Sequence, residues 1–225
     1  MAFPSGAGER GCPRQRASGL DESGRYITMA NMFRYFCGPQ QEMSFLAEGD
    51  VACSLCGERG PCFQLEYALC HSLTPEARKS AIGCCECLRQ GRFEFWHDTE
   101  IGMVDENGLA HVYNHNQPPP PEFPASALVE LRRTPQIVTW QQEVWLTHCN
   151  DFMAYIGTWE PKDFYANAPG GDGRALFQEM TDADLRHLWD ESLRPGAQRL
   201  EAWYATYYAF RCLHCGKLRG NWDCD

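Results

Sequence analysis

Residues 53–58 read Cys-Ser-Leu-Cys-Gly-Glu, and residues 212–217 read Cys-Leu-His-Cys-Gly-Lys. Both segments place two cysteines two residues apart and follow the second cysteine with a glycine and a charged residue. Two intervening residues allow both thiolates to reach one ion from a tight turn, and glycine accepts the backbone conformation that follows the second ligand. This internal repeat predicts two zinc knuckles, around which we expect the rest of the chain to fold.

A second cysteine pair is available for the first knuckle. Residues 84–87 read Cys-Cys-Glu-Cys, and Cys84 fits better than Cys85 because only one residue separates Cys85 from Cys87. Four thiolates would complete a tetrahedral zinc site and leave no position for a catalytic water. We therefore predict one structural zinc ion bound by Cys53, Cys56, Cys84 and Cys87. Cys62, Cys70 and His71 are expected to fill space in the intervening loop.

The second knuckle, Cys212 and Cys215, has no second pair of this kind. Its remaining ligands must come from Cys149, Cys224 or a histidine such as His148, His187 or His214. We predict Cys149 and Cys224. Cys149 is a thiol beside a histidine, and a chain that turned at Gly220 would bring Cys224 back to the knuckle. His214 is expected to point outward.

Composition limits the classes of protein that fit. The chain has 225 residues, 13 cysteines and a formal net charge of -10, with no apolar stretch suited to a signal peptide or a membrane span. We expect a cytoplasmic protein in a reducing compartment, where spaced cysteines bind metal more often than they form disulfides. The acidic excess argues against binding to nucleic acid or to a membrane surface, and so against a zinc-ribbon nucleic-acid binder.

Four regions are expected along the chain. In residues 1–30, apolar side chains recur neither with the period of a helix nor with that of a strand, so this segment is interpreted as a flexible tail. Residues 31–113 contain the first zinc knuckle and begin with a short strand or extended arm at 32–36. Residues 114–125 include four consecutive prolines and form a linker or a stiff loop. Residues 126–225 form a helical region that ends in the second knuckle.

The expected fold class is α+β, with short antiparallel hairpins around the two knuckles and a few helices. Helices are predicted at 126–133 and, from a capping box at Thr181 and Asp184, at 181–193. For residues 140–157 the spacing favours a helix, although it also permits a short strand. Alternation at 204–212 predicts a strand that leads into Cys212. The topology does not follow from these patterns.

The sequence contains none of the common catalytic motifs, namely GxSxG, HExxH, a phosphate-binding loop or a deaminase signature. This favours a protein without catalytic activity. The alternative is an enzyme with an open zinc site made by Cys212, Cys215 and either Cys149 or His148. Asp151 or Glu143 would then act as the base.

Several segments together resemble the bacterial CbrC family, which is associated with tolerance to a colicin. They are FRYFCGP at 33–39, CSLCGERG at 53–60, CCECL at 84–88, the run from RTP to HCND at 133–151, and FRCLHCGK at 210–217. The similarity covers residues 32–225. It implies a bacterial, cytoplasmic, metal-binding protein with no established enzymatic activity. Met153 stands where the family has a second cysteine after the HCND run.

The residues and the resemblance together predict a zinc-stabilised module that binds a protein and neutralises a toxin, as an immunity or bacteriocin-tolerance protein. Toxins that attack nucleic acid are commonly basic, and complementary charge accelerates association. A candidate contact surface is the acidic face formed by Asp182, Asp190 and Glu191.

Overall fold

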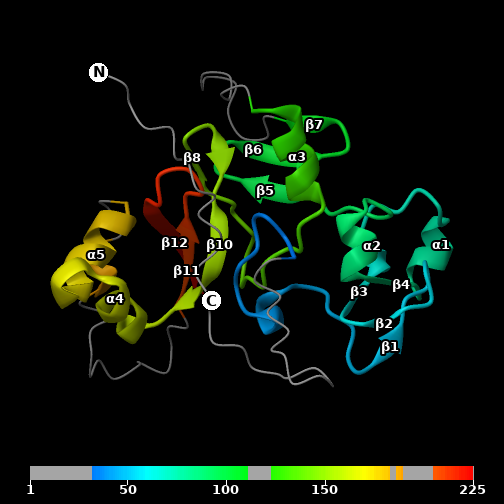
Figure 1. Ribbon diagram of the computed structural model, residues 1–225, viewed down its shortest axis with the longest axis horizontal. Helices are drawn as coiled ribbons and strands as arrows, with labels where there is room; N and C mark the ends of the chain where they lie inside the picture. The colour runs from blue at the N-terminus through cyan, green and yellow to red at the C-terminus, as the bar shows by residue number, and fades with distance from the viewer. Residues whose placement is uncertain (1–31, 111–122, 183–185, 190–204, 225) are drawn as a thin grey trace, which may run out of the picture.

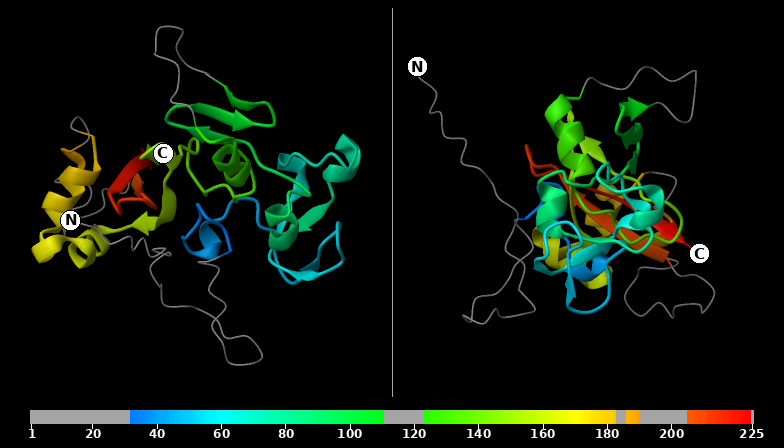
Figure 2. Two further views of the ribbon diagram at one scale, coloured as in Figure 1. Left: turned by 45° about the horizontal axis from the view of Figure 1, so that its top comes forward. Right: turned by 90° about the vertical axis from the view of Figure 1, so that its right-hand side faces the viewer.

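The computed structural model describes residues 32–110, 123–182, 186–189 and 205–224. Helices and short antiparallel sheets are mixed along the chain, which confirms the predicted α+β class. Figure 1 shows a cysteine-rich lobe with α1 and α2 at one end, and helices α4 and α5 beside a three-stranded sheet at the other. Figure 2 shows the same separation from a second direction.

The cysteine-rich lobe consists of two small hairpins and two short helices. β1 (Val51–Ala52) pairs with β2 (Arg59–Gly60), and β3 (Cys62–Gln64) pairs with β4 (Ile82–Cys84), both antiparallel. The helices are α1 (Pro75–Arg78) and α2 (Cys85–Arg89), with single 3-10 turns at η2 (Gln40–Glu42) and η3 (Leu65–Tyr67). Strands of two or three residues are too short to be stable alone, so this lobe needs further stabilisation.

A second small sheet lies between the lobe and the larger sheet. β5 (His97–Thr99), β6 (Gly102–Asp105) and β7 (Gly108–Ala110) form an antiparallel meander, and α3 (Ala125–Arg132) packs against it. Helix α3 confirms the helix predicted at 126–133. Ala127 and Leu131 are its buried residues, and the helix ends before Pro135.

The larger sheet has the strand order β10 (Ala154–Trp159), β11 (Ala205–Arg211) and β12 (Leu218–Cys224), all antiparallel. Strand β11 confirms the strand predicted at 204–212. A short hairpin of β8 (Thr147–His148) and β9 (Asp151–Phe152) precedes β10. The helices α4 (Pro161–Asn167) and α5 (Gly173–Met180), joined by the 3-10 turn η4 (Pro169–Gly171), lie beside this sheet.

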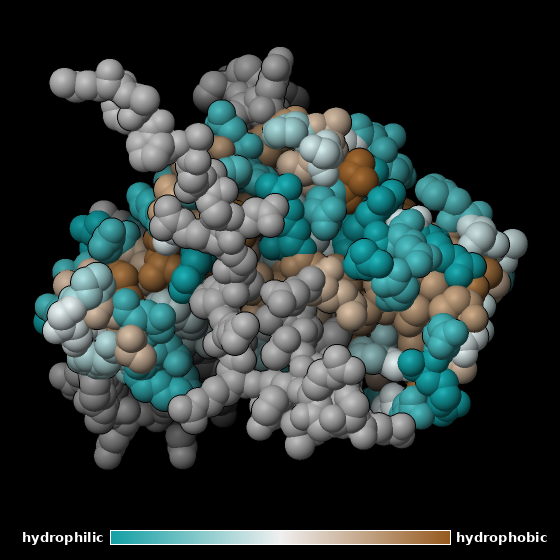
Figure 3. Space-filling model, in the orientation of Figure 1, coloured by the Kyte–Doolittle hydropathy of each residue, from teal (hydrophilic) through white to brown (hydrophobic). Residues whose placement is uncertain are grey.

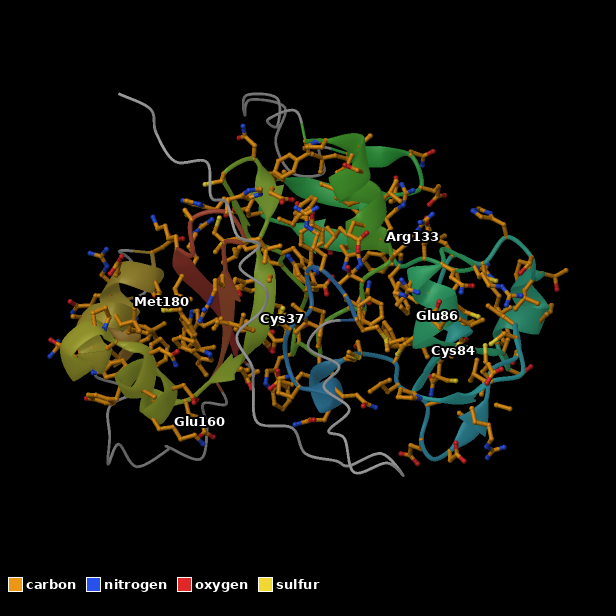
Figure 4. The ribbon with its side chains drawn as sticks, in the orientation of Figure 1. Cys37, Cys84, Glu86, Arg133, Glu160 and Met180 are labelled. Atoms are coloured by element: carbon orange, nitrogen blue, oxygen red, sulfur yellow. The ribbon has the colours of Figure 1, made fainter. Side chains whose placement is uncertain are left out.

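The helix favoured at 140–157 is wrong, because the segment forms β8, β9 and the start of β10. Residues Asp151 through Gly157 are all buried, so neither the period of a helix nor that of a half-exposed strand is visible. Partners distant in sequence decide the structure. β10 pairs with β11, and on its other side Phe36 forms a parallel bridge with Tyr155. Cys37, which Figure 4 labels beside this strand, donates its amide to Tyr155 O.

The capping box predicted at Thr181 and Asp184 stays a prediction, because Asp184 lies outside the described residues. Thr181 ends α5 by donating its amide to Phe177 O at 3.0 Å, and Asp172 caps the start of that helix. Most of the remaining segment expected as a helix, including Asp190 and Glu191, lies outside the described residues, as do residues 1–30 and the four prolines. Met180, at the end of α5, is labelled in Figure 4.

Two hydrophobic clusters form the core of the described residues. The larger one extends from Phe33 to Cys212 and includes residues on both sides of the proline-rich segment. The smaller one lies between the three-stranded sheet and helices α4 and α5, where Phe164 contacts Phe177 and Tyr207 edge to face. On the outside, Figure 3 shows hydrophilic residues spread over both ends of the molecule. In the described part of the chain, no helix has the length and apolar character needed to cross a bilayer.

Candidate metal centres

The first candidate metal centre lies in the cysteine-rich lobe. Cys53 and Cys56 stand in the turn between β1 and β2, Cys84 ends β4, and Cys87 lies in α2. The four sulfur atoms lie within 4.8 Å of one another. Cys53 Sγ is 3.7 Å from Cys87 Sγ, and Cys56 Sγ is 3.6 Å from Cys84 Sγ. These separations match the edge of about 3.8 Å expected for a tetrahedron of four sulfurs around an ion at about 2.3 Å.

Backbone amides surround the sulfurs of this centre. Cys53 Sγ accepts hydrogen bonds from the amides of Leu55 at 3.4 Å and Cys84 at 3.2 Å. Cys84 Sγ caps α2 by accepting the amide of Cys87 at 3.4 Å. Amides directed at sulfur stabilise the thiolate, which is the form that binds metal.

The pKa values of Cys53 and Cys87 are shifted in opposite directions. Burial raises the pKa of Cys53, but the amides of Cys84 and Leu55 outweigh it, so that the pKa falls to about 7. Burial and the neighbouring sulfurs of Cys56 and Cys84 raise the pKa of Cys87. Four adjacent thiolates repel one another, so complete deprotonation requires a cation among them. Arg92 supplies part of that charge, with Nη1 at 3.4 Å from Cys87 Sγ.

The second candidate metal centre lies where two hairpins meet. His148 and Cys149 come from the hairpin of β8 and β9, and Cys212 and Cys215 come from the turn between β11 and β12. Their ligand atoms also lie within 4.8 Å of one another. Cys149 Sγ is 3.8 Å from Cys215 Sγ, and His148 Nδ1 lies 3.1 Å and 3.3 Å from these two sulfurs. Three thiolates and one imidazole are again a tetrahedral donor set.

The two knuckles have the same pattern of backbone hydrogen bonds. In the first, Gly57 donates its amide to Cys53 O and Cys53 donates to Glu58 O, both at 2.8 Å. In the second, Gly216 donates to Cys212 O at 3.0 Å and Cys212 donates to Lys217 O at 2.8 Å. Gly57 and Gly216 have φ values of +81° and +78°, a conformation that favours glycine. The repeat seen in the sequence is therefore a repeat in structure.

A tight turn positions the other half of the second centre. Cys149 and Asn150 connect β8 to β9 with φ values of +55° and +56°. Two consecutive residues with positive φ are typical of the two-residue hairpin turn whose twist matches that of its strands, and asparagine is favoured there. The turn places His148 and Cys149 against the knuckle.

Asp151 links the second centre to the start of the described chain. Its carboxylate accepts hydrogen bonds from His214 Nε2 at 2.8 Å, Tyr35 Oη at 2.6 Å and Arg34 Nη2 at 2.5 Å. As expected, His214 is not a member of the metal cluster. Its half-exposed ring contacts the buried carboxylate of Asp151 instead. Burial and the hydrogen bond to Asp151 raise the pKa of Tyr35, so its hydroxyl remains a donor.

The structure brings together seven of the eight predicted ligands. Cys84, and not Cys85, belongs to the first group. Cys62 and Cys70 are buried, as expected, whereas His71 is exposed and does not fill space in the loop. His148, and not Cys224, is the fourth member of the second group. β12 does not turn at Gly220 but continues from Leu218 to Cys224, and this carries the backbone of Cys224 about 20 Å from Leu218 at the rise of a strand. Cys224 thus pairs with Ala205, at the opposite end of the hairpin from the knuckle.

The fold and the two groups of ligands define a class of protein: a mixed α+β chain with two four-residue clusters suited to binding metal. The model of the uncharacterised protein family UPF0167 matches residues 30–224, so the chain belongs to that family.

Curated relatives carry the same family name. UPF0167 proteins of Mycobacterium bovis and Mycobacterium tuberculosis are each 27% identical over 197 residues, covering 82% of this chain and 88% of theirs. A UPF0167 protein of Pseudomonas aeruginosa is 25% identical over 200 residues, covering 85% of this chain and 95% of its own. No solved structure matches the chain.

Proposed function

We propose that this chain is a binding protein without catalytic activity, folded around two structural zinc ions. The observation that carries the proposal is the convergence of four ligands in each cluster. Sets of four sulfurs, or of three sulfurs and one imidazole nitrogen, are those preferred by zinc, and four protein ligands fill its coordination sphere. A filled sphere supports a structural role, because no position remains for a reacting water.

The enzyme alternative uses Asp151 or Glu143 as the base, and both carboxylates already accept hydrogen bonds from other residues. Asp151 accepts hydrogen bonds from Arg34, Tyr35 and His214. Glu143 is buried, where it is bonded to His97 Nδ1 at 2.7 Å and to the amide of Ile137 at 2.6 Å. These contacts support a structural role for both carboxylates.

For the partner we propose a basic protein toxin that the chain neutralises by binding. The net charge of -10 supports a basic partner and disfavours nucleic acid. The resemblance to the CbrC family supports a toxin in particular, through its association with colicin tolerance. Such a partner would be bound in the bacterial cytoplasm.

A titration distinguishes binding from turnover. The full chain is used to recover partners from its native host, and any toxin recovered is then mixed with increasing amounts of the chain in an assay of toxin activity. A binder protects only as its molar amount approaches that of the toxin, and its association weakens with rising salt. Protection by far less than one equivalent, lost when zinc is removed, would support the enzyme instead.

A further inference from the structure

The loop at residues 137–143 is held in place by two carboxylates. Glu143 Oε1 accepts the amide of Ile137, at the start of the loop, at 2.6 Å. Asp223 Oδ2, on β12, accepts the amides of Trp140 and Gln141, both at 2.8 Å. A loop fixed at its start and at its tip presents its side chains with little entropic cost on binding.

A pocket of about 240 Å³ lies between this loop and strands β11 and β12, which occupy the centre left of Figure 1. Gln141 and Gln142 contribute exposed side-chain amides from the loop, and Asn221 contributes a third amide from β12. Asp223 contributes a carboxylate, and the buried residues Tyr208 and Phe210 of β11 also line the pocket. The side chain of Trp222 packs on the opposite face of the sheet, against the cluster below α4 and α5. Among the described residues that line the pocket, none is basic.

Trp140 stands beside this pocket and is unusual in being both exposed and fixed. Its side chain is 55% exposed, yet its Nε1 donates to Thr206 Oγ1 at 3.0 Å. Val138, two residues earlier, is 48% exposed. An exposed tryptophan held in one orientation is the kind of residue that contributes most at protein interfaces.

We propose that this pocket receives the guanidinium group of an arginine side chain presented by a protein partner. The proposal rests on the binding function proposed above and names the partner's chemistry. Guanidinium is planar and carries five donors and no acceptor. The carboxylate of Asp223 and the side-chain amide oxygen of Gln142 are acceptors for such a group. An anion would meet Asp223, and no described residue that lines the pocket supplies a positive charge beside it.

The site is tested on the full chain with the blocked amino acid N-acetyl-arginine N-methylamide as the probe. Binding is followed by NMR through the tryptophan indole and glutamine amide signals. We expect saturable shifts, and about tenfold weaker binding of the neutral citrulline analogue, because a charge-assisted hydrogen bond is lost. Asp223→Asn keeps an acceptor for the two loop amides and should weaken arginine binding by a similar factor. Gln142→Ala should weaken it severalfold.

Matched controls separate the pocket from general charge effects. Gln64→Ala and Glu106→Gln make the same chemical changes at exposed positions outside the pocket, and both should bind the arginine probe as the wild type does. Equal binding of the citrulline analogue, or equal weakening by Glu106→Gln, would overturn the guanidinium assignment. Binding of free arginine without binding of the blocked probe would overturn the assignment to a protein side chain.

The outcome for the partner distinguishes this proposal from the proposed function. If the wild type recovers a partner and Asp223→Asn and Gln142→Ala recover it equally well, binding stands and the pocket is not the contact. If the wild type recovers no partner and shows no protection against a toxin, the proposed function itself fails, whatever the probe does.

Discussion

His148 completes a cluster whose other three members are cysteines, and its role is decided by the turn that follows it. Its Nδ1 lies 3.1 Å from Cys149 Sγ and 3.3 Å from Cys215 Sγ. These distances are shorter than the edge of about 3.6 Å between nitrogen and sulfur around a zinc ion, so a small outward movement of the imidazole would let it share an ion with both sulfurs.

We therefore expect His148→Ala to lower the zinc content from two ions per chain to one, because three ligands remain at that centre. Cys224→Ser should retain both ions, because the backbone of Cys224 lies at the far end of β12. Metal analysis of the purified variants measures the result, with the exposed His71→Ala as the histidine control. Loss of zinc in Cys224→Ser together with full zinc in His148→Ala would show that the thiol is the ligand.

At the scale of elements, the hairpin of β8 and β9 depends on two consecutive residues with positive φ. Asn150 tolerates this conformation because of its short polar side chain, whereas a β-branched residue does not. Asn150→Val should lower the free energy of unfolding by about 1–2 kcal/mol, and Asn150→Gly should be nearly neutral. Chemical denaturation of the zinc-loaded protein tests both. Equal stability of the valine and glycine variants would contradict the turn assigned here.

The cysteine-rich lobe has strands of only two or three residues, so we expect the metal to hold it together. Cys56→Ser should lower zinc content and solubility and increase hydrogen exchange at residues 51–64 and 82–89. Strands β10, β11 and β12 should keep their protection, because they form a longer sheet over a separate aromatic cluster. Cys85→Ala is the control, and unchanged exchange in Cys56→Ser would contradict the prediction.

At the scale of the whole molecule, four buried tyrosines couple stability to alkaline pH. Burial raises the pKa of Tyr35, Tyr155 and Tyr207 far above the ordinary value of 10.0, and burial and the nearby Asp223 raise that of Tyr208 to about 12. The folded chain keeps these protons where the unfolded chain releases them. The stability they contribute is complete below pH 10 and decreases as the pH rises through the folded values.

Urea denaturation at a series of pH values should show this loss beginning near pH 10, with a slope of about 1.4 kcal/mol per pH unit for each tyrosine. Tyrosinate absorbance measured in parallel should show the hydroxyls of Tyr35, Tyr155 and Tyr207 ionising only with unfolding, and that of Tyr208 ionising near pH 12 if the chain is still folded there. Complete ionisation near pH 10 in a chain that remains folded would contradict the prediction.

Patterns within short stretches of the sequence were sufficient to predict five features. These are the two knuckle turns, helix α3, strand β11 and the four-cysteine group of the first centre. In most cases the residues that decide the structure are close neighbours in the sequence, such as Cys212, Cys215 and Gly216. In the first centre, two pairs of cysteines have the same spacing, and one ion can bind both pairs. The same reasoning identified Cys149 correctly as a member of the second group, because only a few thiols were left.

Tertiary structure alone decided between His148 and Cys224 and between helix and strand at residues 140–157. The spacing within residues 212–224 permitted a turn at Gly220, and the pairing of β12 with β11 excluded it. The burial of both faces of β10 removed the periodicity that sequence analysis needs. The second centre joins ligands that are far apart in the sequence, such as His148 and Cys215. Strand β10 pairs with β11 from Ala154 and Arg211 to Trp159 and Tyr207, across the segment that contains both helices α4 and α5. Local preference does not encode such contacts, because their energy is gained only when the distant partner is in place.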